Sequence, residues 1–109
     1  MNAAEEFEKI RQTWSAAELR SEGGNPAVYL PRFHFNSGGQ PVTMDLLLYP
    51  HTHSGSYATR LFFKKQLSRG PNWASHFICG GTWWAPSWKD VHPGQPWASM
   101  LANHLRAVE

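Results

Sequence analysis

Apolar residues recur at helical spacing near each end of the chain. This spacing places side chains on one face, so residues 3 to about 20 are predicted to form an amphipathic helix that ends at a Gly-Gly-Asn-Pro sequence. A second helix is predicted over residues 97–108, because Pro96 suits the first turn of a helix. The expected buried faces consist of Phe7, Ile10, Trp14 and Ala17 in the first helix and Trp97, Met100, Leu101, His104, Leu105 and Val108 in the second.

Between these helices apolar and polar residues alternate, as they do in strands that bury one face. Residues 28–35, 42–49 and 57–64 are predicted as strands. Pro31 requires an edge position or a bulge, since proline cannot donate a ladder hydrogen bond. The links are short, among them an Asn-Ser-Gly-Gly turn at 36–39, and leave no room for crossover helices. We therefore predict an antiparallel meander of three to four strands. One face of its clearest strand carries Val42, Met44, Leu46 and Leu48.

Regular patterning fades between residues 67 and 96, where glycine and proline recur. An irregular stretch of that length is unusual in a compact domain unless it carries function. The expected architecture is α+β, with an N-terminal helix, an antiparallel meander, a long active-site loop and a C-terminal helix. A chain of 109 residues fits one hydrophobic core, so residues 1–109 are expected to form a single domain.

Composition and charge narrow the classes of function. The net charge is only +2 and no run of Lys or Arg occurs, so no nucleic-acid partner is expected. No apolar stretch reaches the roughly 18 residues of a membrane span, and the acidic N-terminus lacks the order of a signal peptide. The single cysteine cannot form an intramolecular disulfide. We expect a cytoplasmic protein with no membrane partner.

Cys79 is the first candidate for chemistry. It lies in the long loop, two glycines follow it, and His76 precedes it by three residues. Loops commonly present reactive groups. A lone cysteine is more often a small buried apolar residue, and that interpretation stays open. His92 and His104 could approach Cys79, but no Cys-His-Asn protease pattern pairs them with it.

Histidines offer a second candidate, a metal site. His51 and His53 lie two residues apart, with His76 or Cys79 as further ligands. Their spacing matches no common zinc pattern, and two histidines in a loop are more often solvated. We expect no metal and no cofactor.

Tryptophans in the long loop offer a third candidate. Indole faces stack on flat apolar partners, so the three could line a binding platform. The favoured interpretation is that they cover the core and hold a loop that has no hydrogen-bond ladder. These residues are Trp83, Trp84 and Trp88.

Several short motifs follow one another in a fixed order. They are a strand over residues 44–50 ending in Tyr49-Pro50, then Gly70-Pro71-Asn72, Phe77-Ile78-Cys79, Trp84-Ala85-Pro86 and the helix over 97–108. This ordered set resembles the ubiquitin-conjugating enzyme family. There, an apolar strand ending in Tyr/Phe-Pro precedes His-Pro-Asn, Gly-x-Ile-Cys, Trp-x-Pro and a helix. Gly70 stands where the family has histidine, and the spacing from cysteine to tryptophan is shorter. The resemblance is to a minimal, prokaryotic-type member.

The resemblance implies a role for each matched residue. Cys79 would accept the C-terminal carboxyl of a ubiquitin-like protein from an activating enzyme, as a thioester, and pass it to an amine of a protein substrate. The amide of Asn72 would stabilise charge on the thioester oxygen. Asp90 would help to deprotonate the amine, and His76 would flank the thiol. A salt-bridged or solvated Asp90 and a His76 satisfied within a strand are the structural alternatives.

A different class of function is also compatible with the sequence. It is a non-catalytic binding module of similar α+β fold that uses Trp83, Trp84 and Trp88 as its contact surface. Slow reaction of native Cys79 with a thiol reagent would favour this alternative, because a buried structural cysteine is inert.

Overall fold

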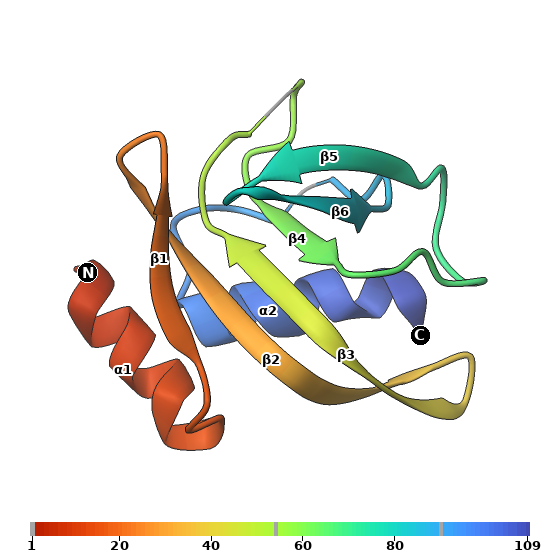
Figure 1. Ribbon diagram of the computed structural model, residues 1–109, viewed down its shortest axis with the longest axis horizontal. Coiled ribbons are helices and arrows are strands. Elements are labelled where there is room, and N and C mark those ends of the chain that lie inside the picture. Colours follow the sequence, from red (N-terminus) through yellow and green to blue (C-terminus); the bar gives the residue numbers. More distant parts are fainter. Residues whose placement is uncertain (1, 54, 90) are drawn as a thin grey trace.

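The computed structural model describes residues 2–53, 55–89 and 91–109 (Figure 1). Its elements in chain order are α1 (Ala3–Thr13), β1 (Glu18–Glu22), β2 (Asn25–Ser37), β3 (Gln40–Tyr49), β4 (Arg60–Phe63), β5 (Ala74–Ile78), β6 (Gly81–Ala85), α2 (Trp97–Leu105) and the 3-10 turn η1 (Arg106–Val108).

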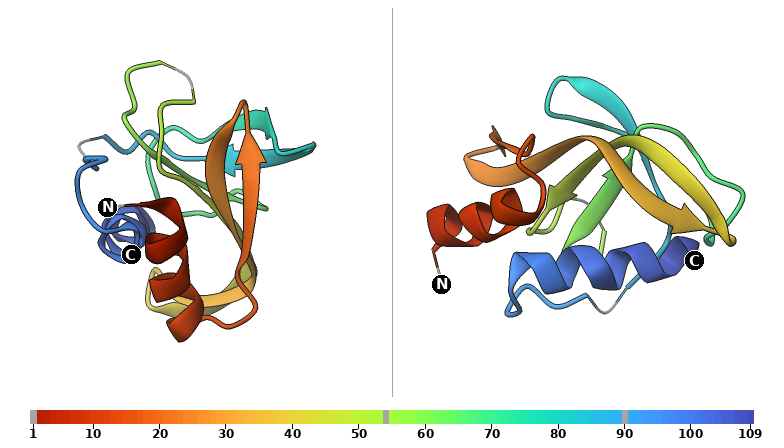
Figure 2. Two further views of the ribbon diagram at one scale, coloured as in Figure 1. Left: turned by 90° about the vertical axis from the view of Figure 1, so that its left-hand side faces the viewer. Right: turned by 90° about the horizontal axis from the view of Figure 1, so that it is seen from below.

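The strands form one antiparallel sheet in the order β1-β2-β3-β4-β6-β5. Both helices lie on the same side of this sheet (Figure 2), and a main core that includes Leu46, Phe63 and Met100 fills the space between them. The other face of β2, β3 and β4 packs against the β5–β6 hairpin in a second core, which includes Phe62 and Trp83. The C-terminal half of β3 and the whole of β4 are therefore buried on both faces. Neither helix of the described chain is long and apolar enough to cross a membrane.

Much of the predicted architecture is confirmed. The protein is α+β, with an N-terminal helix, an antiparallel sheet and a C-terminal helix. The β2–β3 register shifts between Leu30 and Phe33, which is the bulge that Pro31 required. Gly38 and Gly39 make the tight turn between these strands with positive φ angles of 59° and 78°.

Three predictions about the elements were wrong. The first helix ends at Thr13 instead of near residue 20, because Trp14 turns away to donate its Nε1–H to the Pro31 carbonyl (3.1 Å). The residues after it form β1, whose side chains are mostly exposed and gave no alternating apolar pattern. The stretch 67–96 is not a continuous loop, because it contains the β5–β6 hairpin. The sheet consequently has six strands instead of three or four.

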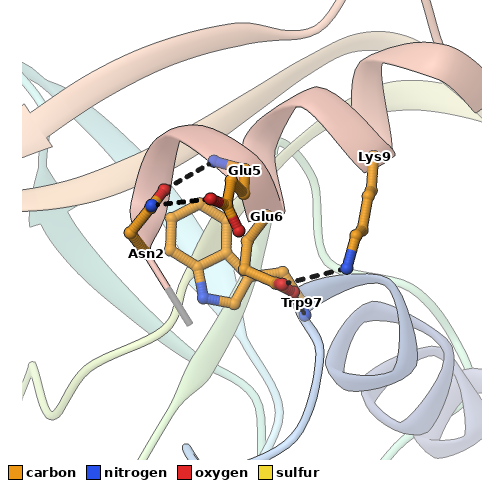
Figure 3. Close-up of polar contacts among 5 residues, drawn as sticks. All are labelled: Asn2, Glu5, Glu6, Lys9 and Trp97. Atoms are coloured by element: carbon orange, nitrogen blue, oxygen red, sulfur yellow. Dashed lines mark hydrogen bonds and ion pairs between the residues drawn. The ribbon is translucent and has the colours of Figure 1, made fainter.

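A buried carboxylate joins the two helices (Figure 3). Glu6 on α1 is 2% exposed, and its Oε1 accepts a hydrogen bond from the backbone N–H of Trp97 at 2.9 Å. The residue before α2 is Pro96, which provides no side-chain cap. Glu6 therefore caps a helix distant in the sequence, where a negative charge is favoured. Its Oε2 lies 3.5 Å from the ammonium of Lys9.

Candidate functional site

Cys79 occupies the turn of the β5–β6 hairpin. Ile78 pairs with Gly81, so Cys79 and Gly80 are the two turn residues. Their φ angles are 51° and 74°. Positive φ at both positions is what a type I′ hairpin turn requires, and a residue other than glycine is strained there. Cys79 and Gly80 thus make a tight turn, where the sequence predicted part of a long irregular loop.

The tip of the neighbouring β1–β2 hairpin holds Cys79 in place. Its backbone N–H donates to Oε1 of Glu22 (2.8 Å), and its Sγ lies 3.8 Å from the carbonyl oxygen of Ser21. Burial raises the pKa of the Cys79 thiol, and the Glu22 carboxylate adds to the rise, while Arg20 opposes it. Cys79 is half-buried. At neutral pH it is a thiol rather than the thiolate that nucleophilic chemistry needs.

Asn72 and Cys79 lie at opposite ends of β5. Asn72 precedes the strand with a φ of 46°, and its carbonyl accepts a hydrogen bond from the hydroxyl of Ser87 (3.3 Å). The strand Ala74–Ile78 separates it from Cys79. At about 3.3 Å per residue, the two are on the order of 20 Å apart. The structure does not bring the expected amide donor to the expected nucleophile.

His76 faces Arg60 in β4 rather than the thiol. The Arg60 guanidinium donates to Nε2 of His76 at 3.2 Å, and the ring centroid of His76 lies 5.4 Å from that of Phe62. Burial lowers the pKa of His76, and the charge of Arg60 and the nearby His53 lower it further. The imidazole is therefore a neutral acceptor. Asp90, the fourth predicted catalytic residue, lies outside the described residues.

The histidines of the considered metal site come only partly together. The ring centroids of His53 and His76 are 5.6 Å apart, and His51 packs against Tyr49 instead. Nε2 of His51 and Nδ1 of His53 are buried and have no hydrogen-bond partner among the described residues. Within residues 2–53, 55–89 and 91–109 no three His, Cys, Asp or Glu side chains form a group that could hold a metal ion.

The loop tryptophans are largely packed. Trp83 is 5% exposed, belongs to the second core, and lies under the ammonium of Lys64, which is 4.8 Å from its ring centroid. The indole N–H of Trp88 donates to the carbonyl of Asn103 on α2 (3.0 Å). Trp84 is half-buried. These contacts correspond to tryptophans that cover the core, which was the favoured interpretation, and not to an open stacking platform.

Sequence reasoning missed Arg60. Arg60 is only 4% exposed, although its side chain carries a full charge. The guanidinium stacks on the ring of Tyr57 at 4.0 Å, besides donating to His76. In the alternating pattern of residues 57–64, Arg60 falls on the polar side of the strand. That face is buried because the β5–β6 hairpin folds onto it, and no local signal in the sequence reports such long-range packing.

Phe77 in β5 is the second feature that the sequence left unassigned. Its side chain is 70% exposed, the highest value for a large apolar residue in the described part of the chain. β5 ends the sheet on one side, because β6 is its only partner among the described strands. An exposed apolar residue on an open edge is a place where another chain can add as a strand.

Comparison of the chain with protein-family models, with curated proteins and with solved structures found no match.

Proposed function

We propose that the protein is a non-catalytic binding module, similar in element order to ubiquitin-conjugating enzymes, that binds an extended segment of a ubiquitin-like protein at the free edge of β5. The observation that carries this proposal is the unprotected edge itself. β5 has the sequence Ala-Ser-His-Phe-Ile, without a charged residue or proline, and it exposes Phe77. An open strand supplies backbone hydrogen bonds to an added strand, while exposed side chains supply selectivity.

The other edge of the sheet provides a contrast. β1 has the sequence Glu-Leu-Arg-Ser-Glu, so three of its five residues are charged. Charged edge residues discourage strand addition, and natural proteins commonly protect exposed edges in this way. β5 lacks that protection. The difference favours β5 as the edge that accepts a partner, although Leu19 on β1 is also exposed.

The surroundings of Cys79 support a binding role over a catalytic one. Thioester exchange needs a reactive thiolate, but Cys79 lies at a strained turn position and the pKa of its thiol is raised. It is also separated from Asn72 by the length of β5. The C-terminal tail of a ubiquitin-like protein is the segment we propose as the partner, because such tails carry the carboxyl group that conjugating enzymes handle.

A titration of the isotope-labelled protein with a ubiquitin-like protein tests this proposal. We expect the β5 amides to become protected from hydrogen exchange, and a partner without its C-terminal tail to give no protection. Phe77→Lys is expected to weaken binding by about tenfold, equivalent to about 1.4 kcal/mol. The matched control, Leu19→Lys on β1, should bind as the wild type does. Equal weakening by both variants, or protection of β1 instead, would contradict the proposal.

Thioester carriage by Cys79 is the second candidate function. One observation favours it: the thiol is only half-buried at the tip of a hairpin, and its nearest described polar partner is 3.8 Å away. In that reaction the Cys79 thiolate attacks the thioester carried by the activating enzyme and displaces that enzyme's cysteine thiolate. A substrate amine then attacks the new thioester, loses a proton as the amide forms and releases the Cys79 thiolate. Incubation with an activating enzyme, ATP and a ubiquitin-like protein should give an adduct that reductant removes and Cys79→Ala abolishes. No such adduct is expected if the protein only binds.

A further inference from the structure

A pocket lies between α2 and the link that joins β6 to α2. Its volume is about 440 Å³, and it is lined by Trp88, Lys89, Val91, Asn103 and Arg106. This volume is within the range of about 300–1,000 Å³ that is usual for small-molecule sites. None of the lining residues belongs to β5, so a ligand here would use no part of the edge proposed above.

Hydrogen bonds to other parts of the fold hold the walls of the pocket. The indole N–H of Trp88 donates to the carbonyl of Asn103 (3.0 Å), which ties the link to α2. The carbonyl of Val91, a buried residue, accepts from the Thr59 hydroxyl at 2.9 Å. The side-chain amide of Asn103 donates to Oε1 of Gln95 (2.7 Å). The pocket is therefore formed before a ligand arrives, which lowers the cost of binding.

Two positive charges border this pocket. Lys89 comes from the link, Arg106 directly follows α2, and both are exposed. Neither belongs to an ion pair in the part of the chain that the structure describes, and none of the five lining residues is acidic. The C-terminal end of a helix favours a cation, which accounts for Arg106 but not for Lys89 on a separate segment. An anion in the pocket is attracted by both charges.

Trp88 and Val91 give the same pocket an apolar side. Trp88 is half-buried and its N–H is already bound to Asn103, so the ring carbons are the part of the indole that can contact a ligand. The three loop tryptophans do not form a shared platform, but this one indole offers an apolar surface in a pocket that two cations also line. The lining thus combines positive charge with an apolar wall.

We propose that the pocket binds a small organic anion in which a flat apolar ring carries a carboxylate or phosphate group. The anionic group pairs with Arg106, whose planar guanidinium suits two oxygens at once, and Lys89 adds a second charge-assisted hydrogen bond. The ring lies against Trp88 and Val91. An anion without a ring leaves the apolar wall uncovered, and a ring without charge leaves the cations unpaired, so tight binding requires both parts.

Five small probes, added to the protein at constant ionic strength set with chloride, test the pocket. Benzoate and phenyl phosphate carry both parts, acetate and inorganic phosphate lack the ring, and benzyl alcohol lacks the charge. The readouts are the indole N–H NMR signal of Trp88 and the midpoint of thermal unfolding. We expect benzoate, phenyl phosphate or both to give a saturable shift of that signal and a rise in the midpoint, as a ligand that binds only the folded state does. The three incomplete probes should bind at least about tenfold more weakly.

Each outcome decides the proposal. A response to benzoate alone identifies a carboxylate ligand, a response to phenyl phosphate alone identifies a phosphate ligand, and a response to both shows that the two cations accept either group. No saturable response to benzoate or to phenyl phosphate overturns the proposal. Equal binding of benzyl alcohol overturns it as well, because the cations then contribute nothing, and so does equal binding of the anions that lack a ring.

Variants locate the bound probe. Lys89→Gln and Arg106→Gln are each expected to weaken its binding by about tenfold or more, since each removes a charge-assisted hydrogen bond. Both residues are exposed, so the variants should fold as the wild type does. Lys65→Gln is the matched control, because Lys65 is also exposed and does not line the pocket. Binding as tight in Lys89→Gln and Arg106→Gln as in Lys65→Gln would overturn the assignment.

Asp90 needs a direct test, since it lies between Lys89 and Val91 in the sequence and is outside the described residues. The variant Asp90→Asn should bind the probe as the wild type does. If the probe binds only after this substitution, a carboxylate of the protein itself neutralises the pocket, and the proposal is overturned.

Discussion

Glu6 and Trp97 are 91 residues apart in sequence, yet the carboxylate of one caps the helix that begins at the other. The bond joins α1 to α2 at the point where the residue before α2 is a proline that provides no cap. It fixes the position of α2 against the sheet and against α1. The main core between helices and sheet depends on that position.

Removal of this cap is expected to destabilise the protein. Glu6→Ala leaves a buried N–H of α2 without an acceptor, which should lower the free energy of unfolding by about 2 kcal/mol. Glu8→Ala is the control on the same helix, because Glu8 is partly exposed and its ion pair in the described chain is with Arg11. We expect the control to cost less than about 0.5 kcal/mol. Urea unfolding of both variants measures the difference, and equal losses would show that the cap contributes nothing.

Stability should fall in mild acid because of His104. Burial, with a further effect of Arg60, lowers the pKa of this imidazole to about 4, from an ordinary value of 6.5. Below pH 6.5 the His104 imidazole binds a proton in the unfolded chain but stays neutral in the folded protein. The contribution of neutral His104 to the free energy of unfolding is therefore fully present above about pH 6.5. It decreases as the pH falls towards 4, by about 3 kcal/mol in total.

Contacts with Thr59 fix which nitrogen of His104 carries the proton. The Thr59 hydroxyl donates to the carbonyl of Val91 (2.9 Å) and lies 2.8 Å from Nε2 of His104, so it accepts the Nε2 proton. Unfolding followed from pH 4 to pH 8 should show a clear slope in the wild type and a smaller one in His104→Leu. His92→Gln, a change at an exposed histidine, should keep the full slope. An unchanged slope in His104→Leu would assign the acid sensitivity to another group.

The sequence predicted those parts of the fold in which local pattern and tertiary packing agree. Residues 42–49 alternate in the printed sequence, and in the structure Leu46 and Leu48 lie in the main core while Leu47 and Tyr49 lie in the second. α2 shows the same agreement, since its apolar stripe is the face that packs on the sheet. In α2 the hydrophobic period determines which side is buried, and in β3 the alternation divides the side chains between the two cores.

The rest depended on contacts that no local pattern reports. β1 is a charged edge strand, so only its pairing with β2 identifies it as a strand. The sequence predicted Cys79 in a long loop, but Cys79 and Gly80 form a hairpin turn that contacts Glu22. The candidate site changed for the same reason. Proximity along the chain had linked Cys79 with His76, whereas the folded sheet places His76 against Arg60.

Strain at Arg32 offers a route to higher stability. This residue lies in the β2 bulge with a φ of 49°, which costs a non-glycine residue about 1–2 kcal/mol. Arg32→Gly should relieve the strain and, after the loss from a more flexible unfolded chain, raise the free energy of unfolding by up to about 1 kcal/mol. Arg32→Ala keeps the strain and serves as the control. A gain in both variants would assign the effect to the arginine side chain instead.

Asp45 should be sensitive at the same bulge. Its carboxylate accepts from the backbone N–H of Arg32 and from the hydroxyl of Tyr29, both at 2.9 Å. Asp45→Ala removes both acceptors and should lower the free energy of unfolding by about 1–3 kcal/mol. Asp45→Asn keeps an acceptor oxygen and should lose less. The comparison in urea unfolding separates the hydrogen bonds from the charge.

Cys79 reactivity separates the two candidate functions most directly. The pKa of its thiol is raised by burial and by Glu22, so the native protein should react with a thiol reagent more slowly at pH 7 than the same chain in denaturant. Glu22→Gln should accelerate the native reaction severalfold, because the amide oxygen still accepts from the Cys79 N–H while the negative charge is gone. Glu18→Gln, a change at an exposed residue of the same strand, should leave the rate unchanged. If the thiol of the native protein reacts as fast as that of the denatured chain, Cys79 is accessible and reactive, and thioester carriage is favoured over binding alone.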